Sequence, residues 1–84
     1  MTHASLADLI SATHESWKAA TRAHDQHAIV SCAEHLEWLA VEALRNLAQD
    51  RTDTVTRRLL TDALRHVADD VPRIGKMLRE AGFR

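Results

Sequence analysis

Residues 29–47 read IVSCAEHLEWLAVEALRNL, and this stretch decides the fold. Its apolar side chains recur every three or four residues, a spacing that places them on one face of an α-helix. It contains no Gly or Pro and is rich in Ala and Leu, which favours a helix over a strand. The apolar stripe consists of Ile29, Cys32, Ala33, Leu36, Leu39, Ala40, Ala43, Leu44 and Leu47. The pattern predicts a helix over residues 26–48 that buries one face.

A shorter amphipathic helix is predicted before it, over residues 5–21, with Ser5 or Thr2 suited to cap its first turn. Its apolar face carries Leu6, Leu9, Ile10, Trp17 and Ala20, and we expect Trp17 to belong to the core. On one continuous helix this stripe and the stripe of the second helix would face different directions. We therefore expect a break near Thr21–Gln26, with Asp25 as the N-cap of the second helix. One unbroken helix with two partner faces is the alternative.

Two further helices are predicted after the polar linker QDRTDT, which ends in residues that cap helices well. They cover residues 54–70 and 71–81. Pro72 separates them, because proline removes a backbone hydrogen bond and clashes with the preceding turn. Asp70 is suited to cap the restarted helix and Gly82 to end it. Since the linker is short, we expect the second and third helices to form a long antiparallel hairpin.

The whole chain, residues 1–84, is predicted to be one all-α domain, an antiparallel bundle of three to four helices built on that hairpin. Hydrophobic residues make up 45% of it and charged residues 27%, which is typical of a folded domain. A core of this size rarely contributes more than about 3–5 kcal/mol. A disulfide cannot add to it, because Cys32 is the only cysteine. The remaining sources of stability are dimerisation, a bound metal or very regular helix packing, and we expect dimerisation to complete the bundle.

Charge and hydropathy restrict the classes of partner. The sequence shows no signal peptide, and its longest apolar run, WLAV, is far shorter than a membrane span, so we expect a cytoplasmic chain without a membrane partner. Residues 1–56 contain four Lys or Arg against eight Asp or Glu, whereas residues 57–84 contain seven against four. The formal net charge of −1 argues against strong nucleic-acid binding. The opposed segments favour ionic pairing within the fold or between subunits.

Histidine is unusually frequent, at six of 84 residues. Imidazole and carboxylate groups suit zinc, iron, copper or nickel, so a transition metal ion is the candidate cofactor. The candidate ligands on or beside the second helix are His24, His27, Glu34 and His35. The chain has no Glu-x-x-His pair, no His-Glu-x-x-His motif and no Cys-x-x-Cys pair, so His14, Glu42, His66 or a second subunit would have to complete the site. The interpretation as solvated surface histidines is favoured, and a metal-binding bundle is the alternative function.

Trp38 lies opposite the apolar stripe of the second helix, on its polar side. A ring of this size must contact either the first helix or a partner, and aromatic residues are enriched at the centres of interfaces. The interface is predicted around Trp38, Glu42 and Arg45. Cys32 lies in the apolar stripe without the exposure that a nucleophile needs, which favours a non-enzymatic role over an enzyme. The leading prediction is a small helical module that self-associates, as a homodimer, or binds another helical protein.

Overall fold

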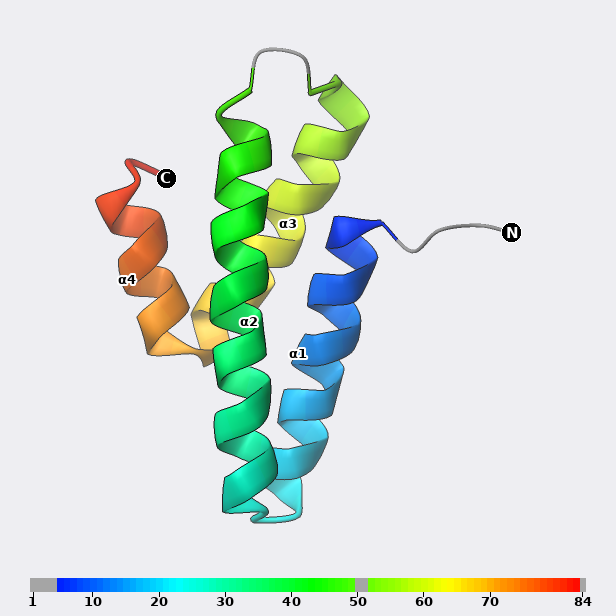
Figure 1. Cartoon of the computed structure of the whole chain (residues 1–84), viewed down its shortest axis with the longest axis vertical. Helices are drawn as coiled ribbons and strands as arrows, with labels where there is room; N and C mark the ends of the chain where they lie inside the picture. The colour runs from blue at the N-terminus through cyan, green and yellow to red at the C-terminus, as the bar shows by residue number, and fades with distance from the viewer. Residues whose placement is uncertain (1–4, 50–51, 84) are drawn as a thin grey trace.

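The computed structural model describes residues 5–49 and 52–83, and this part of the chain forms four α-helices and no strand (Figure 1). The helices are α1 (Leu6–Arg22), α2 (Gln26–Leu47), α3 (Thr54–Asp70) and α4 (Pro72–Glu80). The all-α prediction is therefore confirmed, and each helix end lies within one residue of the position expected from the sequence. The helices α2 and α3 each contact the other three, and α2 makes the most extensive single contact, with α1.

Short polar side chains begin the first three helices. Ser5 accepts a hydrogen bond from the backbone N–H of Asp8 at 3.1 Å, and the Asp8 carboxylate accepts one from the Ser5 N–H at 3.3 Å. The carboxylates of Asp25 and Asp53 accept from backbone N–H groups in the first turns of α2 and α3, at 3.1 and 2.6 Å. The predicted caps Ser5 and Asp25 are confirmed. Thr2, the other candidate, lies outside the described residues.

The turn between α1 and α2 makes the predicted break without a glycine. His24 takes a left-handed backbone conformation, with φ 55°. The N–H groups of His24 and of the next residue donate to the carbonyl oxygens of Thr21 and Ala20, at 3.2 and 3.0 Å. This pair of bonds is a Schellman ending, in which the left-handed position is usually glycine. The chain therefore folds back on itself at His24, and α1 and α2 are two antiparallel helices (Figure 1).

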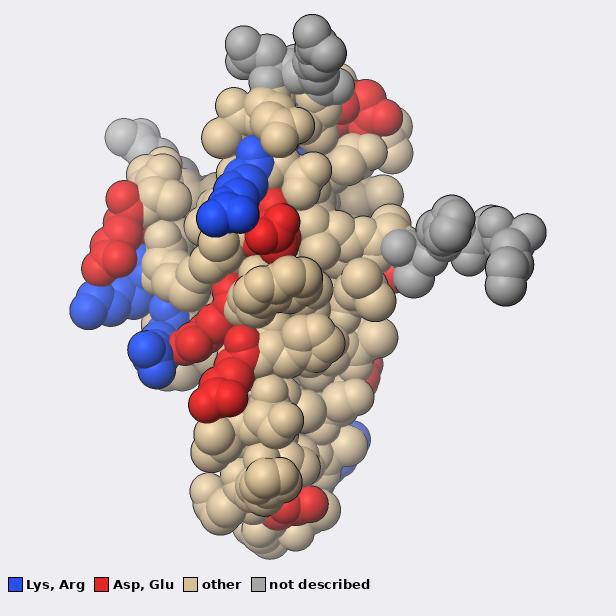
Figure 2. Space-filling view, viewed as in Figure 1, with Lys and Arg blue, Asp and Glu red and all other residues tan. Residues whose placement is uncertain are grey.

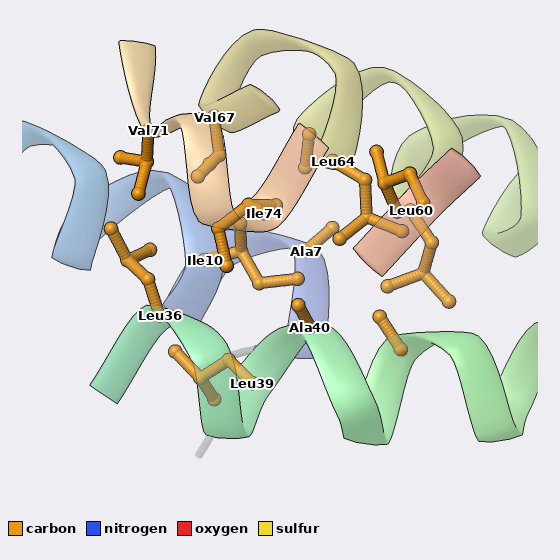
Figure 3. Close-up of a cluster of buried hydrophobic side chains, with 13 residues drawn as sticks. Ala7, Ile10, Leu36, Leu39, Ala40, Leu60, Leu64, Val67, Val71 and Ile74 are labelled. Carbon is orange, nitrogen blue, oxygen red and sulfur yellow. The ribbon is translucent and has the colours of Figure 1, made fainter. Parts of the chain in front are cut away.

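The apolar face of α2 points into a core to which all four helices contribute (Figure 3). Burying one Leu, Ile or Val side chain in this core adds roughly 1.5–3 kcal/mol to the free energy of unfolding. The core residues that are 2% exposed or less are Ile10, Leu36, Leu39, Ala40, Ala43, Leu60, Leu64, Val67 and Ile74. Trp17 is partly buried and packs against this cluster, as the sequence predicts. Leu9, which was expected on the same face, is 44% exposed instead.

The sequence predicted that α2 packs mainly against α3, but in the structure α2 packs mainly against α1. The most extensive contact joins α1 and α2, whereas the contact between α2 and α3 is less extensive. The short turn at His24 holds α1 and α2 side by side, while the longer linker after α2 lets α3 lean away and pack against α1 and α4 as well. The second and third helices are still antiparallel (Figure 1).

The start of α4 differs from the sequence-based expectation. Asp70 was predicted to cap this helix, but Val71 occupies the N-cap and makes no side-chain cap bond, so that prediction is wrong. The residue before a proline is pushed into extended backbone, and Val71 has φ −116° and ψ 98° there, which leaves Asp70 as the last residue of α3. From Pro72 the chain turns back along α3 and comes to lie beside α2 (Figure 1).

Candidate interaction surface

Trp38 lies on the outer face of α2 with 61% of its surface exposed. It lines a groove of about 490 Å³ between α2 and α4. The groove is lined by Glu34, Glu37, Trp38, Val41, Arg73, Lys76, Met77 and Glu80. The first helix packs on another side of α2 and leaves the indole uncovered. Of the two placements that the sequence allowed for Trp38, burial under helix one is therefore excluded.

Apolar side chains form the middle of this groove. Val41 is 38% exposed, and Met77 of α4 is partly buried against the core. Val30, on the same side of α2, is 54% exposed. Scattered exposed apolar residues are normal on a monomer, but a tryptophan with aliphatic neighbours in a groove is typical of a contact surface.

Charged side chains border the apolar centre on both helices. Figure 2 shows acidic groups over the middle of α2 with a basic group above them, and both basic and acidic groups on the adjacent face of α4. Arg73 reaches across the groove to Glu37, with 2.8 Å between its Nε and the Glu37 Oε1. Lys76 pairs along α4 with Glu80 at 3.9 Å. The predicted pairing of the acidic and basic segments thus occurs within the fold in the Arg73–Glu37 contact.

The other two predicted interface residues lie on the same outer face of α2. Arg45 donates to Glu42 at 3.2 Å, and their side chains are 71% and 34% exposed. The ring of His35 lies 6.4 Å from that of Trp38, centroid to centroid, and is tilted by 34° to it. Sequence reasoning identified this side of the surface but missed the α4 side, which Arg73, Lys76 and Met77 form. The available signal was Pro72, which forces α4 to start in a new direction.

The four predicted metal ligands are exposed and are spread along about three turns of chain. His24 lies in the turn before α2, His27 in its first turn, and Glu34 and His35 further along. Across residues 5–49 and 52–83, no three or more His, Cys, Asp or Glu side chains come together in a group that could hold a metal ion. The backbone conformation of His24 accounts for its place in the turn. The metal hypothesis stays a prediction without a converging set of ligands.

The sequence did not predict that His14 is buried in contact with Asp70. His14 is 5% exposed, and its Nε2 lies 2.7 Å from the Oδ2 of Asp70. Its ring centroid lies 6.3 Å from that of Trp17. The side chain of His66, by contrast, is bonded to the backbone oxygen of Asp62, in its own helix, at 2.7 Å. His14 therefore has a structural partner across the fold, outside the α2–α4 groove.

Within the described part of the chain, two carboxylates have shifted pKa values. The pKa of Glu15 is lowered because Lys18 donates a hydrogen bond to it and adds a nearby positive charge. The pKa of Asp53 is lowered because Thr56, through its side chain and its backbone N–H, donates to the carboxylate. Both groups are on the surface and neither lines the groove. These shifts reflect local helix chemistry and do not mark a catalytic acid or base.

No protein-family model, curated protein or solved structure matched the chain in our comparisons. None of the helices in the described ranges combines the length and the apolar character that crossing a bilayer requires. Function is therefore inferred from the surface around Trp38.

Proposed function

We propose that the chain is a small non-enzymatic helical module that self-associates as a homodimer through the face formed by α2 and α4. One observation carries the proposal. Trp38 is the largest of the exposed apolar side chains in the described ranges, and it is 61% exposed beside a groove with an apolar middle and a charged border. This arrangement has the anatomy of a protein interface, in which an aromatic anchor is surrounded by polar residues.

The size of the molecule fits this proposal. A stable interface covers roughly 800 Å² on each partner. The chain exposes 6035 Å², so such an interface would take about one-eighth of its surface. The outer face of α2 is long enough, because the helix has 22 residues and extends about 33 Å. Association would also add stability to a core that is small for an isolated domain.

Sedimentation velocity over a wide range of protein concentrations tests the proposal. We expect the wild-type chain to shift from monomer to dimer as concentration rises. Trp38→Ala should raise the dissociation constant at least about tenfold. Truncating a central aromatic side chain commonly lowers the free energy of association by about 2 kcal/mol or more. The matched control is Val55→Ala, which removes an apolar side chain that is 68% exposed on α3 and outside the groove.

Two results would contradict the proposal. The first is a wild-type chain that sediments as a monomer at every concentration. The second is a dimer that Trp38→Ala and Val55→Ala affect equally, because the groove would then not be its interface. Far-ultraviolet circular dichroism of each variant establishes that the helices are intact, so that a loss of association is not a loss of fold.

A further inference from the structure

The outer face of α2 carries a regular line of exposed side chains. Its members are Glu34, Trp38, Val41 and Arg45, which all lie on the exposed side of the helix. The intervals along this line are four, three and four residues, the spacing that forms a straight seam in paired helices. The two middle positions are apolar, and the two ends carry opposite charges. We call these four residues the α2 seam.

The α2 seam is symmetric about its own midpoint, which lies between Trp38 and Val41. Trp38 and Val41 lie 1.5 residues on either side of this point, and Glu34 and Arg45 lie 5.5 residues on either side. At 1.5 Å of rise per residue, the charged ends are each about 8 Å from the midpoint. A twofold axis through the midpoint and perpendicular to α2 therefore exchanges an apolar position with an apolar one and an acidic position with a basic one.

We infer that the occupant of this face is a second copy of the chain, with the two α2 helices antiparallel about that axis. The inference rests on the proposed self-association and specifies its geometry. In this arrangement Glu34 lies opposite the partner's Arg45, and Trp38 lies opposite the partner's Val41. The twofold symmetry makes each of these contacts occur twice. Such a contact is isologous, so it closes after two copies. A parallel pair would instead place Glu34 against Glu34 and Arg45 against Arg45, which repel.

The groove beside the α2 seam completes the contact. The helix α4 runs alongside α2 in the same direction (Figure 1), and the Arg73–Glu37 contact shows that these two residues lie at the same level. Met77, one turn further along α4, then lies near Val41, and both line the groove. In the antiparallel pair, the partner's Trp38 arrives at the level of Val41. Each indole is thus placed to bury itself against the aliphatic side chains of the other copy.

The charged ends of the α2 seam are available for this pairing. Glu34 is exposed, and the Arg45 side chain is 71% exposed. The hydrogen bond from Arg45 to Glu42 joins neighbouring turns of one helix on the surface, and pairs of this kind contribute little. Arg45 is therefore free to turn toward a carboxylate on a second copy without a large loss.

Charge reversal tests the register. In the symmetric dimer, position 34 of each copy faces position 45 of the other. Glu34→Arg therefore creates two repulsive Arg–Arg contacts, and Arg45→Glu creates two repulsive Glu–Glu contacts. We expect each single variant to raise the dissociation constant about tenfold or more. The double variant Glu34→Arg/Arg45→Glu restores both opposite-charge pairs and should return to within about threefold of wild type. An equimolar mixture of the two single variants should form a heterodimer of about wild-type affinity. Arg58→Glu, on the exposed side of α3, is the control for net charge.

The outcomes separate this inference from the proposed function. Wild-type chains that never associate would overturn both. A wild-type dimer that Trp38→Ala dissolves, but whose single charge variants show neither loss nor recovery on mixing, would overturn the antiparallel register and leave self-association standing. Recovery in the double variant and in the mixture, with no effect of Arg58→Glu, would support the register.

Discussion

The Nε2 atom of His14 in α1 lies 2.7 Å from the Oδ2 atom of Asp70, the last residue of α3, although 56 positions separate them in sequence. His14 is buried, whereas the Asp70 side chain is 42% exposed. The contact connects α1 to the residue after which the chain turns into α4. It therefore joins the middle of α1 to the C-terminal end of α3.

We expect His14→Ala to lower the free energy of unfolding by about 1–3 kcal/mol, because it removes a hydrogen bond and leaves a small cavity. Asp70→Asn keeps an acceptor and should cost less than Asp70→Ala, which leaves the buried imidazole nitrogen without its partner. Urea denaturation of the three variants measures these changes. Asp69→Ala, at the exposed neighbouring position, is the control, and equal effects of Asp69→Ala and Asp70→Ala would show that the contact adds no stability.

Two adjacent leucines on α3 should respond very differently to truncation. Leu60 is 2% exposed and Leu59 is 51% exposed. We expect Leu60→Ala to cost about 2–5 kcal/mol, since it opens a cavity in the core. Leu59→Ala should change the free energy of unfolding by less than about 0.5 kcal/mol. Urea denaturation of both variants at one protein concentration checks the pair, and similar losses would mean that the core is not packed as described.

The helix ends were predictable because local chemistry decides them. Ser5, Asp25 and Asp53 cap the turns that follow them with short polar side chains. Pro72 stops α3 by sterics that depend only on its neighbours. The apolar stripe of α2 likewise identified the face that the core would bury. These features depend on residues within a turn or two of one another, so a single sequence contains them.

The proposed interaction surface was only half predictable because it depends on how distant helices pack. The sequence placed Trp38 on the polar side of α2 but could not tell whether α1 would cover it. The α4 wall of the groove depends on the direction in which the chain leaves Pro72. The partners His14 and Asp70 show no common pattern in the sequence. The periodicity of a sequence shows which face of a helix is apolar. It does not show which other helix packs on that face, because this depends on the tertiary structure.

The two glycines of the last segment should respond oppositely to alanine. A Cβ added at Gly75 would lie 3.5 Å from the Ala68 carbonyl oxygen and 3.4 Å from the end of the flexible Arg79 side chain, which can move. Gly75→Ala should therefore raise the free energy of unfolding by about 0.5–1 kcal/mol. Gly82 has φ 77°, so Gly82→Ala should lower it by about 1 kcal/mol. Thermal and urea unfolding of both variants test the signs, and a loss in Gly75→Ala would mean that α3 and α4 pack more tightly than described.

The helix α4 also has a Schellman ending, because the N–H groups of Gly82 and Phe83 donate to the carbonyl oxygens of Arg79 and Leu78, at 3.0 and 2.9 Å. At the end of α1, His24 holds the left-handed position that Gly82 holds there, but with a side chain. We expect His24→Gly to be neutral or to stabilise by up to about 1 kcal/mol, because it relieves the steric cost of positive φ. His24→Val should destabilise by about 1–2 kcal/mol, since a branched side chain fits this conformation poorly. His27→Ala, in the first turn of α2, is the control. A clear loss of stability in His24→Gly would indicate that the imidazole itself stabilises the turn.

Asp53 should make the stability of α3 depend on pH. Its pKa in the folded chain lies below the ordinary value of 3.8, because Thr56 donates hydrogen bonds to the ionised carboxylate. A lowered folded pKa means that the unfolded chain takes up the proton first as the pH falls. The stabilising contribution is thus fully present above the unfolded pKa and is lost as the pH falls through the folded pKa.

Asp53→Asn retains an N-cap but does not titrate. Urea denaturation from about pH 7 to about pH 3 should therefore show the stability of the wild-type chain relative to Asp53→Asn decreasing toward the acid end. A difference that is constant with pH would show that the charge of Asp53 contributes nothing beyond its cap geometry.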